Sequence, residues 1–198
     1  MAAHRRAQMM EETRVKLIRA ARKAFAQVGY AEASMDELTE AAGLTRGALY
    51  HNFGGKKGLL AAVIEQLDAE MAAKASAAGG TAETPWLGFL AEGVAYIGLA
   101  LEPEIQRIML RDGPAVLGDP SRWPGQSACL RTTTATIQAL IDAGTVRSVD
   151  AEAAARLING AALNAALWVA ASEAPHIVLP KAVEAFRCLA AGLLDAEA

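Results

Sequence analysis

The most constraining feature of this chain is the segment 34–53, SMDELTEAAGLTRGALYHNF, which holds two short helix signals separated by a turn. Ser34, with Glu37 three residues later, has the pattern of a capping box, so a helix is expected to begin directly after Ser34. Gly43 supplies the positive φ that a helix C-terminal cap needs. Thr45 then caps a second helix. Two short helices joined by such a tight turn are typical of a helix-turn-helix.

The second of these helices has a buried face and a polar outward face. Leu49 and Phe53 are four residues apart, which places both on the side of the helix that packs against a core. The side chains left to face outward are Arg46, Gly47, Ala48, Tyr50, His51 and Asn52. This mixture of cation, hydroxyl and imidazole suits phosphates and base edges. Taken alone, the pattern fits an ordinary corner between two helices equally well.

Gly47 is the least expected residue on that outward face. A glycine inside a helix costs roughly 1 kcal/mol relative to alanine. Its presence suggests a position where a large partner approaches the backbone closely. A DNA duplex is such a partner.

Charge is distributed unevenly along the chain. Residues 1–58 contain ten Lys and Arg against six Asp and Glu, whereas residues 59–198 contain nine against sixteen. The first segment is therefore net +4 and the second net −7, although the whole chain is only −3 at pH 7. A basic first third attached to an acidic remainder is typical of a DNA-binding module joined to a separate sensor. A merely solvated charged face is the simpler alternative.

Helices on both sides of the two short ones carry these basic residues. An apolar stripe predicts a first helix over residues 13–28. Its opposite face holds four cations: Arg14, Arg19, Arg22 and Lys23. Lys56 and Lys57 open a later helix, where ammonium groups and free backbone N–H groups together suit a phosphate.

At this point the residues resemble, in order and spacing, the N-terminal DNA-binding domain of the TetR family of bacterial transcriptional regulators. The resemblance extends from about Glu12 to Met71. It is carried by Thr13, Ala20, Ala21, Phe25, Gly29, Tyr30, Ser34, Leu38, Ala42, Gly43, Leu44, Gly47, Leu49, Tyr50, Phe53, Lys56 and Leu59. It implies an all-α protein of about nine helices, with an N-terminal three-helix helix-turn-helix domain and a C-terminal helical domain for ligand binding and dimerisation.

The resemblance also implies roles for individual residues. In that family the residue matching Thr45 caps the recognition helix, the next three lie toward the bases, and later polar residues bind backbone phosphates. The DNA-binding residues expected on this basis are Ser34, Thr45, Arg46, Gly47, Ala48, Tyr50, His51 and Lys56.

Two positions depart from the family pattern. Thr39 replaces the alanine usual at the helix crossing, so either the two helices sit slightly apart or the hydroxyl bonds back to its own helix. Asn52 replaces the histidine that most often precedes the phenylalanine.

Gly54, Gly55 and Gly58 loosen the start of the fourth helix, which in this family moves when ligand binds.

Three parts are expected along the chain: a flexible basic arm over residues 1–11, a helix-turn-helix domain over residues 12–58 and a helical domain over residues 59–198. The first residues lack the apolar core of a signal peptide. The uncharged stretch 157–172 is interrupted by polar residues, which favours a buried bundle helix over a membrane span. We therefore expect a cytoplasmic protein without a membrane partner.

The C-terminal part is helical by period, with no convincing strand. Helices are expected over residues 56–76, from Pro85, over a short segment after Pro103, and over residues 126–143, 151–171 and 180–194, with an irregular stretch at 113–125. The last helix is apolar on two faces, and small residues on the preceding helix permit close approach. Both features favour a homodimer formed through the last two helices, which would match a palindromic double-stranded DNA operator.

Aromatic and methionine side chains with a few polar groups would make an adaptable pocket for a small-molecule effector. The candidates are Trp86, Phe89, Tyr96, Met109, Trp123, Asn164 and Trp168. Each of them, taken singly, is more often a core residue than a ligand contact. Arg107, Arg111 and Arg131 are alternatives for an anionic ligand, although the apolar composition favours a hydrophobic or aromatic one.

Catalysis has little support in the sequence. His4, His51 and His176 have no spacing suited to a metal site or to a nucleophile and base pair, so no metal and no cofactor are expected. Cys129 and Cys188 are too few for a disulfide framework and are interpreted as reduced core residues.

The sequence therefore predicts a ligand-responsive, DNA-binding transcriptional regulator, most simply a repressor that a small hydrophobic ligand releases from its operator. The main alternative is a helical enzyme or small-molecule carrier whose N-terminal domain does not bind DNA specifically. A second alternative is an architectural DNA protein, which would bind without operator preference.

Overall fold

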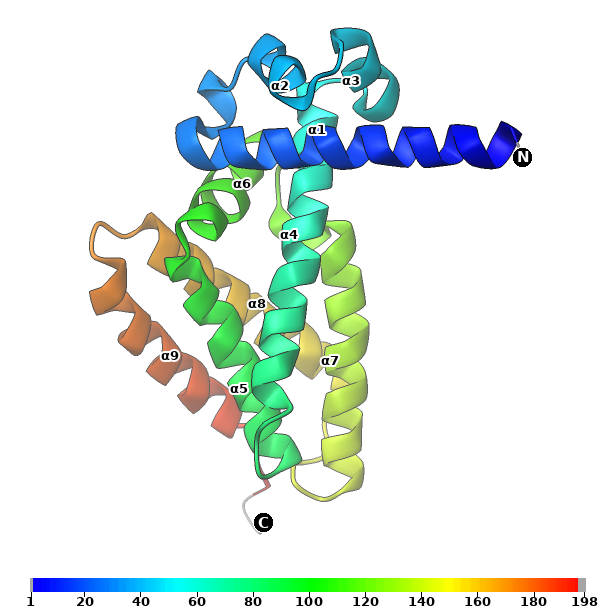
Figure 1. Cartoon of the computed structure of the whole chain (residues 1–198). Coiled ribbons are helices and arrows are strands. Elements are labelled where there is room, and N and C mark those ends of the chain that lie inside the picture. The colour runs from blue at the N-terminus through cyan, green and yellow to red at the C-terminus, as the bar shows by residue number, and fades with distance from the viewer. Residues whose placement is uncertain (1, 196–198) are drawn as a thin grey trace.

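The computed structural model describes residues 2–195, whose regular elements are helices (Figure 1). They are α1 (Ala2–Glu32), α2 (Met35–Ala42), α3 (Arg46–Phe53), α4 (Lys56–Gly79), α5 (Pro85–Gly98), α6 (Gly113–Leu117), α7 (Pro124–Asp142), α8 (Ala151–Ala171) and α9 (Pro175–Ala191). Two short 3-10 helices, η1 (Leu99–Leu101) and η3 (Pro120–Arg122), and a π-helix, η2 (Ile105–Asp112), lie between them. An isolated antiparallel bridge joins Val146 to Leu194. The expected all-α fold is confirmed.

The helices α2 and α3 begin where their capping residues predict. Ser34 Oγ accepts a hydrogen bond from the N–H of Asp36, and Thr45 Oγ1 accepts one from the N–H of Ala48, both at 3.2 Å. The reciprocal glutamate bond of the predicted capping box is absent from the hydrogen bonds of the described residues. Gly43 ends α2 in the left-handed region, with φ 66°.

The first helix is much longer than the expected 13–28. The segment 1–11, expected to be a flexible arm, is helical from residue 2 onward, because no glycine or proline interrupts a run made largely of good helix formers. Figure 1 shows this first part of α1 extending beyond the rest of the molecule. Near the other end, Gly29 has φ 84° and departs from helical geometry. A Cβ at that position would lie 2.6 Å from the guanidinium of Arg107.

The C-terminal helices agree with the expected order but differ in extent. The bounds of α8 match the prediction, whereas the stretch 113–125, expected to be irregular, contains α6 and η3. The short helix expected after Pro103 is the π-helix η2. The last helix, α9, begins at Pro175 rather than Pro180, because a proline at the first helical position needs no N–H partner.

One hydrophobic core runs through both halves of the molecule along α4. This helix contacts α1 and α3 as well as α5, α6, α7 and η2. Its buried side chains are Leu59, Leu60, Val63, Ile64, Leu67, Met71 and Ala75. Structurally, α4 therefore belongs to both expected domains and connects them.

The helix α8 is long and apolar enough to cross a membrane by length and composition, but it packs against α5, α7, α9 and η2 within the protein. These contacts fit the interpretation of a bundle helix.

The two cysteines differ from their prediction: Cys129 and Cys188 are exposed rather than part of the core.

Candidate functional site

The outward surface of α3 is built as the residue spacing predicts. Leu49 is fully buried beneath it. Arg46, Gly47, Tyr50 and His51 are exposed, and these four residues are called the α3 surface below. Ala48, expected to face outward with them, is half-buried.

Arg46 does not project freely from the α3 surface. Its guanidinium forms a two-point ion pair with the carboxylate of Asp36 on α2, and the Nη2 to Oδ2 distance is 2.6 Å. Both side chains remain more than half exposed. A planar guanidinium held in this way has a fixed direction, so Asp36 helps to decide where Arg46 points.

No contact within the described part of the protein requires a glycine at position 47. A Cβ at this position would meet only Thr45 Oγ1, at 3.7 Å, which is an ordinary van der Waals distance. The backbone of the first turn of α3 therefore lies open to any partner on that side.

Tyr50 is 53% exposed, and its ring leans toward Gly55 at the start of α4. Lys56, predicted to bind phosphate, is only half-exposed. Its ammonium donates to the Ala31 carbonyl at 3.1 Å and lies 4.5 Å from the centre of the Tyr30 ring. Lys56 thus holds the end of α1 against the start of α4.

The two departures from the family pattern both have a local explanation. Thr39 is buried, and its hydroxyl donates back to the carbonyls of Met35 and Asp36 at 3.0 Å, as one of the two predicted options requires. Asn52 is half-buried rather than outward-facing, and its Nδ2 donates to the Ala48 carbonyl at 2.8 Å.

Polar contacts tie α1 to the C-terminal half. Arg22 forms ion pairs with Glu70 of α4, at 2.6 Å, and with Glu104, just before η2, at 2.7 Å. The bond from Arg22 holds the pKa of Glu70 below its usual value. A shift of η2 or α4 would therefore be passed to α1 through this side chain.

A second set of contacts lies at the end of α1. Arg107 of η2 donates to the Val28 carbonyl at 2.7 Å. Asp112, the last residue of η2, accepts from the N–H of Tyr30 at 2.7 Å. The π-helix thus contacts the N-terminal domain directly, a connection that periodicity did not reveal.

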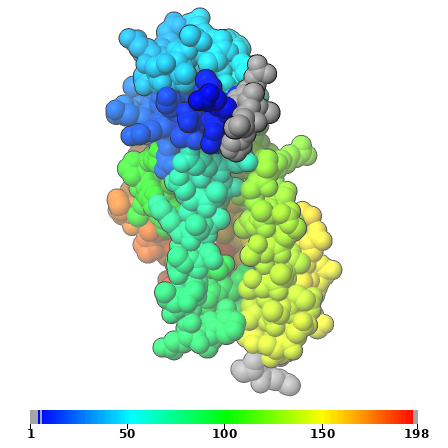
Figure 2. Space-filling view, turned by 45° about the vertical axis from the view of Figure 1, so that its right-hand side comes forward, coloured from blue at the N-terminus to red at the C-terminus, as the bar shows by residue number. Residues whose placement is uncertain are grey.

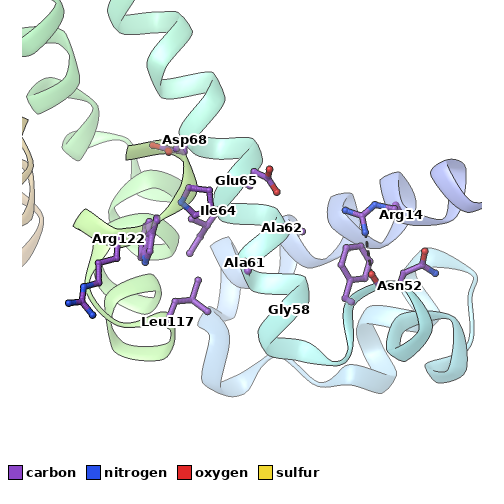
Figure 3. Close-up of a pocket in the computed structure, with 14 residues that line it drawn as sticks. Arg14, Asn52, Gly58, Ala61, Ala62, Ile64, Glu65, Asp68, Leu117 and Arg122 are labelled. Atoms are coloured by element: carbon purple, nitrogen blue, oxygen red, sulfur yellow. Dashed lines mark hydrogen bonds between the residues drawn. The ribbon is translucent and has the colours of Figure 1, made fainter. Parts of the chain in front are cut away.

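A pocket of about 500 Å³ lies across α4, between the N-terminal helices and the connection that precedes α7 (Figure 3). We call it the junction pocket. Arg14 of α1 and Asn52 of α3 border it on one side, and Leu117 and Arg122 border it on the other. In Figure 2 the connection before α7 projects beside α4, just below the N-terminal segment. The residues that line the pocket are Arg14, Asn52, Phe53, Gly58, Ala61, Ala62, Ile64, Glu65, Asp68, Leu117, Arg122, Trp123, Pro124 and Gly125.

Of the seven residues predicted to line an effector pocket, Trp123 lines the junction pocket and the other six lie elsewhere. Phe89 and Met109 are buried in the core, and Trp86 packs on Phe89 with ring centres 5.6 Å apart. Burial of the Tyr96 hydroxyl, followed by the charge of Asp68, raises its pKa. Asn164 and Trp168 face outward on α8.

The arginines considered for an anionic ligand are differently placed. Arg107 and Arg111 both donate to backbone carbonyls, Arg111 to that of Ala170 at 2.7 Å. Arg131 is exposed on α7. Among the described residues, no group of three or more His, Cys, Asp or Glu side chains is placed to hold a metal ion.

Two family models match this chain. Residues 17–63 match the model described as "Bacterial regulatory proteins, tetR family", and residues 86–193 match "Tetracyclin repressor-like, C-terminal domain". The second match alone covers more than half of the chain. The chain belongs to the TetR family. The first match ends within α4 and the second begins at the start of α5, so the rest of α4 and the loop that follows it lie between the two matched segments.

Solved and curated TetR-family proteins resemble this chain to different extents. A TetR-family transcriptional regulator from Pectobacterium atrosepticum has 50% sequence identity and a TM-score of 0.87, over 94% of this chain and 96% of that one. The repressor AcnR of Corynebacterium efficiens is 33% identical over 100 residues, and the regulator SrpR of Pseudomonas putida is 42% identical over 62. These matches span 52% of AcnR and 29% of SrpR.

A second exposed surface of this TetR-family chain is apolar. Trp168 on α8 is 50% exposed, and Leu157, Ile177 and Leu189 on α8 and α9 are more exposed still. We call these four residues the α8–α9 surface. Leu189 lies on the second apolar face predicted for the last helix, while Phe186 on the other face is buried.

Proposed function

We propose that this protein is a ligand-responsive transcriptional repressor, which acts as a homodimer on a palindromic double-stranded DNA operator in the cytoplasm. The observation that carries the proposal is the α3 surface. The short helix α3 is capped by Thr45 and presents a cation, a tyrosine and a histidine to solvent. These side chains surround Gly47, which has open space above it. Nothing in the packing of the described residues requires that glycine. A duplex approaching the backbone supplies the reason.

In this proposal α3 enters the major groove by its first turn. Arg46, Gly47 and Ala48 lie toward base edges, while Thr45 caps the helix and positions it. Tyr50 and His51 bind phosphates, together with Ser34 and Lys56 at the flanking helix starts. Because the Lys56 ammonium already has protein partners, its contact with phosphate requires a small rotation away from the Ala31 carbonyl.

The α8–α9 surface supports a dimer through the last two helices. Large apolar side chains are exposed on both of these helices, and exposed apolar surface favours burial against a partner. A second copy of the same surface covers them and forms a four-helix contact. Two α3 helices related by a twofold axis would then read two half-sites about one helical turn apart.

We propose a division of labour that follows the chain. Residues 12–58 bind DNA, residues 59–198 bind effector and form the dimer, and residues 2–11 extend the first helix. Two sets of contacts connect the two parts: Arg22 of α1 pairs with Glu70 and Glu104. In the second set, Arg107 and Asp112 bond to the end of α1. An effector that favours one arrangement of these contacts changes the population of the DNA-binding form.

The proposal is tested by selection of duplexes from a random library with the purified protein at two salt concentrations. An enriched palindrome whose occupancy falls steeply with salt is expected, because phosphate contacts release counterions. Sequence-indifferent binding would favour an architectural DNA protein. Absence of binding at low salt, after removal of any co-purified ligand by unfolding and refolding, would favour the enzyme or carrier alternative.

A further inference from the structure

The junction pocket contains buried polar groups that no part of the described protein satisfies. Trp123 is 9% exposed, and its Nε1–H is buried without a hydrogen-bond acceptor. The Oδ1 of Asn52, at the other side of the pocket, is buried without a donor. Buried polar groups are rarely left without partners, so two of them beside one pocket mark it as a place where the described protein leaves polar groups unsatisfied.

The pocket also holds carboxylates without a cation. Among the described residues, Glu65 and Asp68 accept no hydrogen bond and form no ion pair. They lie three residues apart on α4 and both line the pocket, but Glu65 is exposed to solvent whereas Asp68 is half-buried. Burial raises the pKa of Asp68, which means that its charged form lacks a compensating partner.

The two arginines that line the pocket are not available to these carboxylates. Arg14 donates to the Asn52 carbonyl at 3.2 Å and lies 4.7 Å from the centre of the Phe53 ring. Arg122 is largely in solvent and faces Asp119 at 4.0 Å. Among the described residues, Asp68 thus has no cation to pair with.

Asp68 and Trp123 are held in place by close packing. A Cβ at Gly125, in the first turn of α7, would lie 1.6 Å from Asp68 Oδ2, so the carboxylate lies directly against that backbone. A Cβ at Gly113 would lie 2.7 Å from Cη2 of Trp123, so the benzene edge of the indole abuts α6. Both functional groups therefore have fixed positions before any ligand arrives.

We propose that the junction pocket is an effector site for an organic cation: a compact aromatic amine whose ammonium group donates to Asp68 and whose ring lies against Phe53 and Trp123. The volume of about 500 Å³ lies within the roughly 300 to 1,000 Å³ of small-molecule sites. The walls contributed by Phe53 and Trp123 suit an aromatic body. This ligand class differs from the neutral hydrophobic one that composition alone favoured.

The site contacts the recognition helix from behind. Asn52 and Phe53 are the last two residues of α3, and the opposite wall belongs to the C-terminal domain. A ligand that bridges the two walls fixes the angle of α3 relative to α7. Its effect on operator binding, which rests on the proposed function, is a linkage: ligand and DNA alter each other's affinity by the same factor.

The test uses three probes of one shape and different charge: 2-(1-naphthyl)ethylamine, 2-(1-naphthyl)ethanol and 1-naphthaleneacetate. Binding to the full-length protein is measured by calorimetry and by the indole N–H signals of Trp86, Trp123 and Trp168 in an ¹⁵N spectrum, assigned with single Trp→Phe variants. The amine is expected to bind about tenfold or more tightly than the alcohol, because its ammonium group forms a charge-assisted hydrogen bond with the Asp68 carboxylate that a neutral hydroxyl does not match. Its binding shifts the Trp123 signal and leaves the other two unchanged.

Variants locate the interaction. Asp68→Asn is expected to lower amine affinity about tenfold and to leave alcohol binding unchanged. Glu173→Gln, which removes an exposed carboxylate far along the chain, leaves both unchanged. Equal affinity for amine and carboxylate, an unmoved Trp123 signal, or no binding of any probe at millimolar concentration would overturn the site.

The readouts above do not involve DNA, so the site and the proposed function fail separately. Amine binding at Trp123 without any change in operator affinity would leave the site intact and refute its role as an effector site. A protein that binds the amine but no DNA would refute the repressor function instead.

Discussion

The α3 surface and the α8–α9 surface are both exposed in this chain, yet they are made of opposite residue types. The first combines a paired arginine, a glycine, a tyrosine and a histidine over the fully buried Leu49. The second presents a tryptophan and three aliphatic side chains. Exposure alone therefore does not identify a partner, whereas the chemistry of the exposed side chains does. Hydrogen-bonding groups around an open backbone suit a nucleic acid. Unpartnered apolar groups suit another protein surface.

The largest expected effect comes from the apolar surface. Trp168→Ala should weaken the dimer by about 4 kcal/mol, near a thousandfold in Kd, because an interface tryptophan is often worth about 2 kcal/mol and occurs once in each copy. Sedimentation equilibrium measures this change. Leu87→Ala removes a similarly exposed apolar side chain on α5 and should leave the dimer unchanged. A Trp168→Ala protein that dimerises like the wild type would remove the distinction between the two surfaces.

The next effect concerns the support beneath the α3 surface. Leu49→Ala should lower the free energy of unfolding by about 3 kcal/mol, since it removes a fully buried side chain from the core. Chemical denaturation checks this value. Val15→Ala, at an exposed position of α1, should change stability by less than about 0.5 kcal/mol. Equal effects of the two substitutions would mean that α3 is not anchored as described.

Gly47→Ala separates stability from binding. The new methyl group meets no close neighbour, so the variant should gain about 0.5 to 1 kcal/mol of unfolding free energy from helix propensity. It should nevertheless bind the operator more weakly, because the methyl group occupies the space meant for DNA. Thermal denaturation and operator titration give the two values. A variant that is more stable and binds equally well would show that the open backbone has no partner.

The smallest stability effect is expected at Asp36. Because the Asp36–Arg46 pair is exposed, Asp36→Ala should cost less than about 1 kcal/mol. Freeing Arg46 should still change which operator bases are preferred, a result that selection on a random library would reveal. An unchanged preference would mean that the ion pair does not position Arg46 for base contact.

The helix-turn-helix could be predicted in detail because its determinants are local. Ser34, Gly43 and Thr45 act within three residues of their own positions, so spacing alone places the ends of α2 and α3. The i, i+4 pair of Leu49 and Phe53 gives the buried face in the same way. Even here, pairing across helices was missed, since nothing in the spacing links Asp36 to Arg46.

The pocket could not be predicted because it depends on how distant segments pack. Its walls come from α1, α3 and α4 and from the connection before α7, a stretch expected to be irregular. Only Trp123 was anticipated there, because an aromatic residue among prolines and glycines needs a surface to cover. Asp68 and Asn52 gave no signal, since a lone carboxylate or amide on a helix is ordinarily solvated.

The central claim, that the α3 surface docks on DNA, is tested most directly by operator titrations of the wild type and Tyr50→Ala over a range of salt concentrations. We predict that Tyr50→Ala lowers affinity about tenfold on the operator and on unrelated duplexes alike, with a shallower dependence on salt, because a phosphate contact carries no sequence information. Unchanged affinity with an unchanged salt slope would contradict the docking of α3 and, with it, the account of this surface.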